Sequence, residues 1–155
     1  MGQLSYNDWR MKHQGSYTYL LDRNGELLQE GRIDYKDRQL GWHASSSFSD
    51  ALKTELITFE DKHFYSHHGV DWSSLAYNSV RWIKAEKVRG ASTITMQLVN
   101  LIYPNLRSEP DYKLQQISRA IWLEKQWSKD QILEAYLNRV PLRGELRGFP
   151  AASRV

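Results

Sequence analysis

The sequence contains no cysteine, and it has no apolar run of the ~18 residues needed to span a bilayer. The absence of cysteine excludes disulfide scaffolds, thiolate metal sites and cysteine nucleophiles. Neither sign of charge dominates, because 21 Lys and Arg stand against 18 Asp and Glu, for a net charge of +3. With 41% hydrophobic and 25% charged residues, the composition is that of a folded globular chain rather than a disordered or fibrous one. A length of 155 residues is sufficient for one domain with a buried core.

Basic residues nevertheless gather in two segments, one at 81–89 and the other at 139–154. Each segment holds four lysines or arginines and a single glutamate. Such patches suit an anionic ligand or a membrane surface. An ordinary solvated face accounts for either patch equally well when that patch is taken alone.

The first third of the chain predicts a β-hairpin over residues 16–34. Tyr17, Tyr19 and Leu21 alternate toward an Asp-Arg-Asn-Gly turn at 22–25, which is a hairpin signal. From Ser47 onward the apolar residues follow a helical period. We expect helices over 50–64, 71–83, 93–103, 110–127 and 128–137. The fold class is therefore mainly α, with a small N-terminal β-hairpin element.

Caps and apolar faces define these helices. Phe48, just before the helix over 50–64, and Leu52, Leu56 and Phe59 within it recur at helical spacing and form its apolar side. In the helix over 110–127 the corresponding face should carry Leu114, Ile117 and Ile121. The expected starts are the capping boxes Ser47 with Asp50 and Ser128 with Gln131, the N-cap Asp71, and Ser92 or Thr93.

The densest polar cluster, at residues 60–71, opens with two adjacent carboxylates. Glu60 and Asp61 point about 100° apart on a helix, so they cannot flank one bond as a catalytic pair. At most one of them is expected to do chemistry directly, while the other can brace the following loop. Glu60 follows Phe59 on the apolar side, and a place at the edge of the core would suit it to act as a general base.

A histidine metal site competes with this interpretation of the first cluster. His63 and His67 are spaced for one face of a helix, and His68 is adjacent to the second. The glutamate nevertheless lies outside the pair, unlike the H-E-x-x-H zinc motif. Histidines that brace the turn toward Gly69 are favoured over a zinc site, so no metal site is expected in the protein itself.

The second polar cluster, at residues 89–97, predicts an anion site at a helix start. Arg89 and Gly90 precede Ser92 and Thr93, so backbone N–H groups and a positive charge could meet a phosphate. No lysine follows at the spacing of a Walker loop. An ordinary Ser or Thr cap beside a loop arginine explains the same residues. A third group, Lys113 with Arg119 and Glu124, lies on a helix whose long basic side chains would ordinarily face solvent.

Taken together and in this order, these segments resemble the transglycosylase domain of penicillin-binding proteins, glycosyltransferase family 51. The first family motif, EDxxFxxHxGxD, is matched by Glu60, Asp61, Phe64, His67, Gly69 and Asp71. The second, GGSTxTxQL, is matched by Gly90, Ser92, Thr93, Thr95, Gln97 and Leu98, with Ala91 in place of the second glycine. The fourth, SKxxILExYLN, is matched by Ser128, Lys129, Ile132, Leu133, Glu134, Tyr136, Leu137 and Asn138.

The sequence departs from the family pattern at several positions. In the third motif, usually RKxxE, Tyr112 stands at the arginine position, Lys113 is retained and Gln116 replaces the glutamate. In the second motif Asn100 stands where a lysine is usual and Met96 where glutamine is common. The methionine and the glutamine resemble the C-type branch of penicillin-binding proteins.

The resemblance implies a lysozyme-like helical lobe and a polymerase of lipid-linked disaccharide. In this reaction the acceptor 4-hydroxyl attacks the donor's anomeric carbon with inversion, and undecaprenyl pyrophosphate leaves. The implied partners are lipid II, the growing glycan strand and the outer face of the bacterial cytoplasmic membrane, with cell-wall synthesis proteins as further candidates and no nucleic acid. The resemblance implies that Glu60 is the base and that Asp61, Phe64 and His67 support the catalytic loop. It further implies residues that bind the sugar and the pyrophosphate, with Mg²⁺ as an optional bridge: Arg89, Gly90, Ser92, Thr93, Gln97 and Lys113.

Two other functions stay open, a lysozyme-like glycan hydrolase and a non-catalytic module that binds glycan or lipid-linked precursor. The expected organisation is an N-terminal β and linker region over 1–46 and a partial transglycosylase domain over 47–155, without the part that closes the lobe. The apolar side chains left in water would then favour self-association. These side chains are Leu133, Leu137, Val140 and Leu142.

Overall fold

The structure is a computed structural model that describes residues 4–83 and 92–154, with the side chains of 78–83 left out. The described chain is mainly helical and carries one antiparallel pair of strands, as the sequence predicts. It forms two compact units. The first unit joins the chain up to Ala44 to the segment from Glu134 onward, and the second runs from Ser45 to Leu133.

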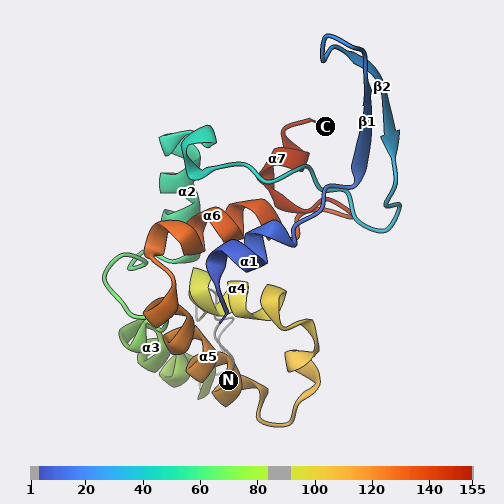
Figure 1. Ribbon diagram of the computed structural model, residues 1–155. Coiled ribbons are helices and arrows are strands. Elements are labelled where there is room, and N and C mark those ends of the chain that lie inside the picture. Colours follow the sequence, from blue (N-terminus) through green and yellow to red (C-terminus); the bar gives the residue numbers. More distant parts are fainter. Residues whose placement is uncertain (1–3, 84–91, 155) are drawn as a thin grey trace. The chain divides into compact units, whose positions relative to one another are not determined.

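The first unit contains the hairpin (Figure 1), whose strands are β1 (Tyr17–Leu21) and β2 (Leu27–Arg32). Tyr17 pairs with Arg32 at its base, and a register irregularity follows Leu20. The turn is held by Asp22, whose Oδ1 accepts hydrogen bonds from the backbone N–H groups of residues 24 and 26. The hairpin prediction is therefore confirmed, including the position of its turn.

Two residues of α6 (Lys129–Arg139) hold the N-terminal segment of this unit. Glu134 Oε1 accepts hydrogen bonds from the Tyr6 hydroxyl at 2.5 Å and from Trp42 Nε1 at 2.6 Å. Asn138 is buried, and its side chain bonds both the backbone N–H and the carbonyl of His43. Burial and the Glu134 carboxylate raise the pKa of the Tyr6 hydroxyl. Glu134 and Asn138, two positions of the fourth motif, thus have structural roles in this chain.

Two short helices of the first unit were not expected from the sequence. These are α1 (Tyr6–Met11), which is capped by the Ser5 hydroxyl, and α7 (Gly148–Ala152). Each has at most six residues, too few to show a helical period. Their existence depends on packing rather than on pattern.

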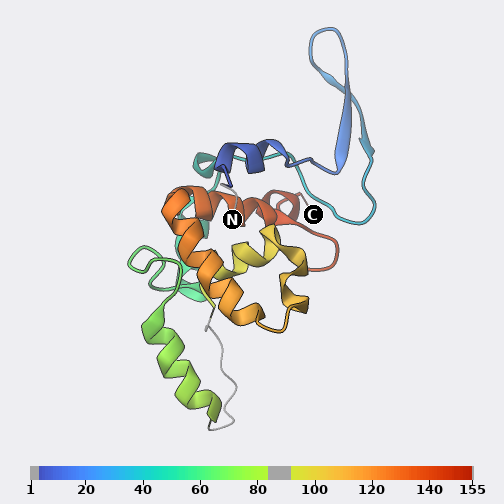
Figure 2. The same cartoon turned by 60° about the horizontal axis from the view of Figure 1, so that its bottom comes forward.

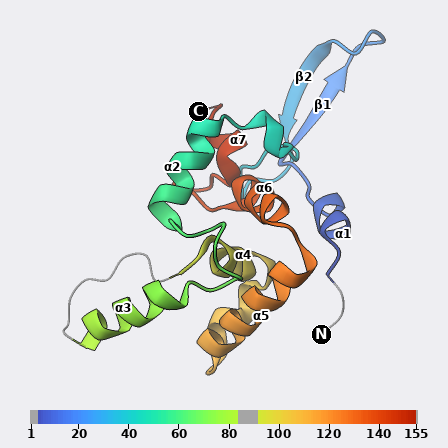
Figure 3. The same cartoon turned by 90° about the vertical axis from the view of Figure 1, so that its left-hand side faces the viewer.

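The second unit is helical, and its α4 and α5 pack side by side (Figures 2 and 3). The expected Thr93 cap of α4, Asp71 cap of α3 and Ser128–Gln131 capping box are all observed. Its elements are η1 (Ser45–Ser47), α2 (Asp50–Glu60), α3 (Trp72–Ile83), α4 (Ile94–Ile102), η2 (Pro104–Ser108), α5 (Tyr112–Gln126) and the start of α6.

The helix expected over 50–64 is shorter than predicted. Its N-cap is Ser49, whose hydroxyl accepts from Leu52 N, so the expected Ser47–Asp50 capping box is wrong. The helix ends at Glu60 because Asp61 leaves the helical conformation, with φ −161° and ψ 74°. No residue of α2 is fully buried, and Phe59 is 80% exposed. Phe48 is buried and Leu52 and Leu56 are half-buried, so the apolar period marks a partly covered face from which Phe59 is excluded.

The inner face of α5 also differs from the prediction. Leu114 is 71% exposed, whereas Gln116, Ala120 and Leu123 are buried. Gln116 is accommodated because its Nε2 donates to the Met96 carbonyl of α4 at 3.0 Å. A hydrogen bond to the neighbouring helix thus rotates a polar side chain into the core, where pattern alone would place a leucine.

The exposed apolar surface expected near the C-terminus is absent from the described residues. Leu133, Leu137 and Val140 are buried, and Leu142 is half-buried. The prediction of self-association depended on these side chains being exposed, and their burial removes its basis.

Gly69 explains one position of the first motif and generates a stability prediction. Its φ is +88°, and a Cβ there would lie 2.6 Å from the Ala120 carbonyl carbon of α5. Gly25 has a similar φ of +84°, but nothing lies within 4 Å of its Cβ position. Gly69→Ala should lower the free energy of unfolding by about 3 kcal/mol or more, because strain and a backbone clash add. Gly25→Ala, the control, should cost only about 1–2 kcal/mol.

Urea unfolding of both variants measures the difference. Equal losses for Gly69→Ala and Gly25→Ala would show that the loop does not press against α5 as described.

Candidate active site

Glu60 is the last residue of α2, and its carboxylate meets α4. Its Oε2 accepts a hydrogen bond from Gln97 Nε2 at 2.8 Å. The side chain of Glu60 is exposed, which corrects the expectation that it lies at the edge of the core. The structure thus brings together one residue of the first motif and one of the second, with the carboxylate open to solvent.

Asp61 has the opposite environment from its neighbour. Its side chain is 3% exposed, and both carboxylate oxygens lie within 3.0 Å of His67 Nε2. Because a carboxylate only accepts, the imidazole carries its proton on Nε2. Asp61 Oδ2 also accepts from the backbone N–H of Ile94, the first residue of α4, at 2.9 Å. Asp61 therefore joins the loop after α2 to the start of α4.

A second buried carboxylate, Glu124, supports the same loop. It is 4% exposed and accepts from the Thr95 hydroxyl at 2.5 Å and from Lys129 Nζ at 2.8 Å. The Lys129 ammonium also lies 4.5 Å from the centre of the buried Phe64 ring. Sequence reasoning missed this role of Glu124, although its place one residue after an apolar leucine was an available sign of burial.

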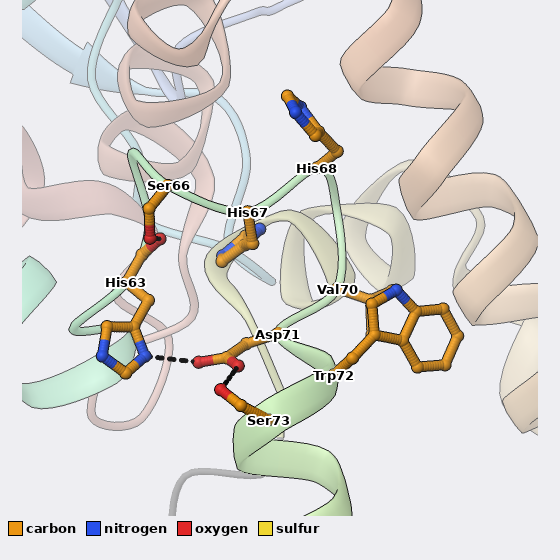
Figure 4. A pocket seen from close by; sticks show the side chains of 8 residues that line it. All are labelled: His63, Ser66, His67, His68, Val70, Asp71, Trp72 and Ser73. Atoms are coloured by element: carbon orange, nitrogen blue, oxygen red, sulfur yellow. Dashed lines mark hydrogen bonds and ion pairs between the residues drawn. The ribbon is translucent and has the colours of Figure 1, made fainter.

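A hollow of about 440 Å³ lies along the loop between α2 and α3 (Figure 4). His63 Nδ1 lies 2.6 Å from Asp71 Oδ2, and Asp71 also accepts from Ser73 and Ser74. Burial alone would raise the pKa of Asp71, but these hydrogen bonds together hold it well below its usual value. Trp72 borders the hollow and is 59% exposed.

The histidines of this loop serve separate carboxylates. His63 pairs with Asp71 and His67 with Asp61, and the segment that carries them is a series of turns rather than a helix. Within the described parts of the chain, no three His, Asp or Glu side chains are grouped so that they could hold a metal ion. The loop-bracing interpretation of these histidines is the one that the geometry favours.

The start of α4 is largely bonded within the protein. The Thr93 hydroxyl is buried, donates to the Gly69 carbonyl at 2.7 Å and accepts from Met96 N at 3.1 Å. The Thr93 hydroxyl is therefore used to cap the helix and does not face solvent. The next backbone N–H, that of Ile94, is likewise occupied because it donates to Asp61. Arg89 and Gly90, expected at the same place, lie outside the described residues.

Lys113 lies beside this helix start on α5. Its Nζ is 3.0 Å from Gln116 Oε1 and 3.5 Å from the hydroxyl of the half-buried Ser92. Burial lowers the pKa of the Lys113 ammonium. The structure therefore groups Ser92 with Lys113, as the anion-binding prediction requires, and places a neutral amide between Lys113 and the core.

The double role of Asp61 generates a second stability prediction. Asp61→Asn replaces one acceptor oxygen by a donor that faces either the Ile94 N–H or His67 Nε2–H. We expect a loss of about 2–4 kcal/mol in the free energy of unfolding, because a buried bond to a charged group is broken. Asp50→Asn, at a side chain that is 96% exposed and paired only with Lys53 among the ion pairs described, should change it by less than about 1 kcal/mol. Thermal unfolding that showed equal small effects would contradict the role of Asp61.

Comparisons with known proteins agree with these motifs. The family model described as Transglycosylase matches residues 24–155. Penicillin-binding protein 4 of Bacillus subtilis is 34% identical over 142 residues, which cover 91% of this chain and 22% of that protein. Penicillin-binding protein 1B of Escherichia coli is 40% identical over 115 residues, 70% of this chain and 13% of that protein.

A shorter relative is the biosynthetic peptidoglycan transglycosylase of Acinetobacter baylyi. It is 38% identical over 130 residues, which cover 79% of this chain and 57% of that protein. The chain thus spans between about one eighth and three fifths of the length of these relatives. Because the family model matches residues 24–155, most of its length, the chain belongs to the transglycosylase family.

Proposed function

We propose that this chain is a peptidoglycan glycosyltransferase that extends glycan strands from lipid II. The observation that carries the proposal is the contrast in burial and hydrogen bonding between two adjacent carboxylates. Asp61 is buried and fully engaged in holding the loop to α4, whereas Glu60 is exposed and bonded to Gln97. An exposed carboxylate at the end of a helix, fixed by the braced loop that follows it, suits a base that must reach a substrate hydroxyl.

The proposed reaction begins with Glu60 accepting the proton of the acceptor sugar's 4-hydroxyl. The oxygen attacks the donor's anomeric carbon, the bond from that carbon to the pyrophosphate oxygen breaks, and the configuration is inverted. Gln97 orients the Glu60 carboxylate through its 2.8 Å hydrogen bond. The products are a strand longer by one disaccharide and undecaprenyl pyrophosphate.

Positive charge is needed where the pyrophosphate leaves. Among the described residues Lys113 supplies this charge, and the neighbouring Ser92 hydroxyl can donate a hydrogen bond to a phosphate oxygen. From the motif alone, Arg89 is proposed to add a second positive charge and Gly90 a backbone N–H. Thr93 contributes by capping α4 rather than through a free hydroxyl. Mg²⁺, if bound at the pyrophosphate as the family resemblance implies, would add positive charge there; the proposed roles are those of the protein's own residues.

The exposed aromatic side chains of α3 are consistent with a donor that is bound to a membrane. Trp72 and Tyr77 are 59% and 66% exposed, and amphipathic aromatics suit a lipid interface. No helix in the described residues has the length and apolar character to cross a bilayer. We propose that the chain acts at the outer face of the bacterial cytoplasmic membrane, where lipid-linked precursor and glycan strand would meet it.

Glu60→Gln tests the proposal, because it keeps the shape and the bond to Gln97 but removes the base. Polymerisation of lipid II should fall by about 10²–10⁴-fold, while binding of the precursor persists. Glu55→Gln, at an exposed glutamate of the same helix, is the control and should polymerise normally. The readout is glycan-strand length on gels.

Near-normal polymerisation by Glu60→Gln would contradict the assignment of the base. Precursor binding without polymerisation by the unaltered chain would support a binding module instead, and release of fragments from finished glycan would support a hydrolase.

A further inference from the structure

Gln116 occupies an unusual place for an amide. It is 1% exposed, and both ends of its side chain are bonded: Nε2 donates to the Met96 carbonyl at 3.0 Å and Oε1 accepts from Lys113 Nζ at 3.0 Å. The carbonyl partner fixes which end of the amide faces which way. Its oxygen is therefore directed at the Lys113 ammonium.

Lys113 is consequently held by neutral groups alone. Its hydrogen-bond partners are the Gln116 amide and the Ser92 hydroxyl, and no carboxylate of the described chain lies within ion-pair distance of it. Lys129 differs, because its ammonium is paired with the buried Glu124. The half-buried charge of Lys113 is thus oriented without being neutralised.

We propose that Gln116 is a positioning residue that presents Lys113 with its charge uncompensated, and that this lets the pyrophosphate of the donor act as the missing counter-ion. The inference rests on the proposed function, since it concerns the strength with which the same site holds its anionic ligand. It goes further in naming the residue that sets this strength.

The alternative side chain at this position would act in the opposite direction. A glutamate at 116 would give Lys113 an internal counter-ion, and an entering anion would have to compete with it. The same carboxylate would also place an acceptor against the Met96 carbonyl, where the amide now donates. A neutral amide therefore serves both the packing of α5 on α4 and the availability of the charge.

The first test needs no variant. The amine of Lys113 should titrate below an ordinary lysine, because burial disfavours its charge, and inorganic pyrophosphate should raise that pKa by supplying the counter-charge. By linkage, the affinity for pyrophosphate falls as the pH rises through the lowered pKa. NMR of labelled lysine side chains, assigned with Lys113→Arg, follows the titration. An unchanged pKa in saturating pyrophosphate would overturn the proposal.

The second test compares Gln116→Glu with Gln116→Met, which has a similar length and no charge. Gln116→Glu should weaken pyrophosphate binding about tenfold, raise the pKa of the free Lys113 ammonium and reduce the salt dependence of binding. Gln116→Met removes the acceptor that orients Lys113 but adds no counter-charge, so it should weaken binding only about threefold and leave the salt dependence of binding unchanged. A parallel loss of affinity in both variants, following their melting temperatures, would assign Gln116 a structural role only and overturn the proposal.

Two different outcomes separate the proposed anion site from the proposed role of Gln116. If pyrophosphate shifts no resonance of Ser92 or Lys113, the proposed anion site itself is wrong. If it binds there and Gln116→Glu binds it as tightly as the unaltered chain, only the role of Gln116 is wrong.

Discussion

The buried carboxylate of Asp61 is the constraint on which the candidate site depends. Removing this charge from water is costly unless strong donors meet it, and here His67 and the first N–H group of α4 do so. The loop after α2 is therefore tied to the start of α4 at one point. Glu60 ends α2 immediately before that point, so the tie also brings its carboxylate to Gln97, one turn along α4.

The same arrangement separates groups that hold structure from groups available to a ligand. Asp61, Glu124 and Thr93 are buried, and their hydrogen bonds are made within the second unit. Glu60 is exposed and Lys113 is only half-buried between neutral partners. An exposed carboxylate and a positive charge on a braced framework suit the proposed transfer from a pyrophosphate donor, which needs a base and a cation.

Local signals carried most of what could be predicted from the sequence. The hairpin turn, the Thr93 and Asp71 caps and the Ser128–Gln131 capping box each depend on a few neighbouring residues, and each is observed. The pairing of first-motif and second-motif residues was anticipated only through the family resemblance, because spacing alone does not say which helix ends meet. Arg89 and Gly90 lie outside the described residues, so their roles stay predictions.

The errors arose where a distant partner decides the outcome. On α5, apolar periodicity predicts that Leu114 is buried, but Gln116 is buried instead because it donates a hydrogen bond to the Met96 carbonyl. On α2, the same periodicity includes Phe59, which is exposed. The buried Glu124 and the half-buried Glu134 also resist prediction, because a carboxylate withdrawn from water is stable only beside donors from other segments. Helical periodicity predicts the buried face of a helix from its apolar residues alone. In the structure, the hydrogen bonds available on the neighbouring helix also decide which face is buried.

Hydrogen exchange at the backbone N–H of Ile94 tests the central claim most directly. First-turn amides of a helix have no intrahelical partner and ordinarily exchange quickly. If Asp61 fixes the start of α4, the Ile94 amide should exchange as slowly as the amides in the middle of α4, and it should lose this protection in a chain with His67 intact and the Asp61 carboxylate removed. Rapid exchange of Ile94 in the unaltered chain would contradict the account.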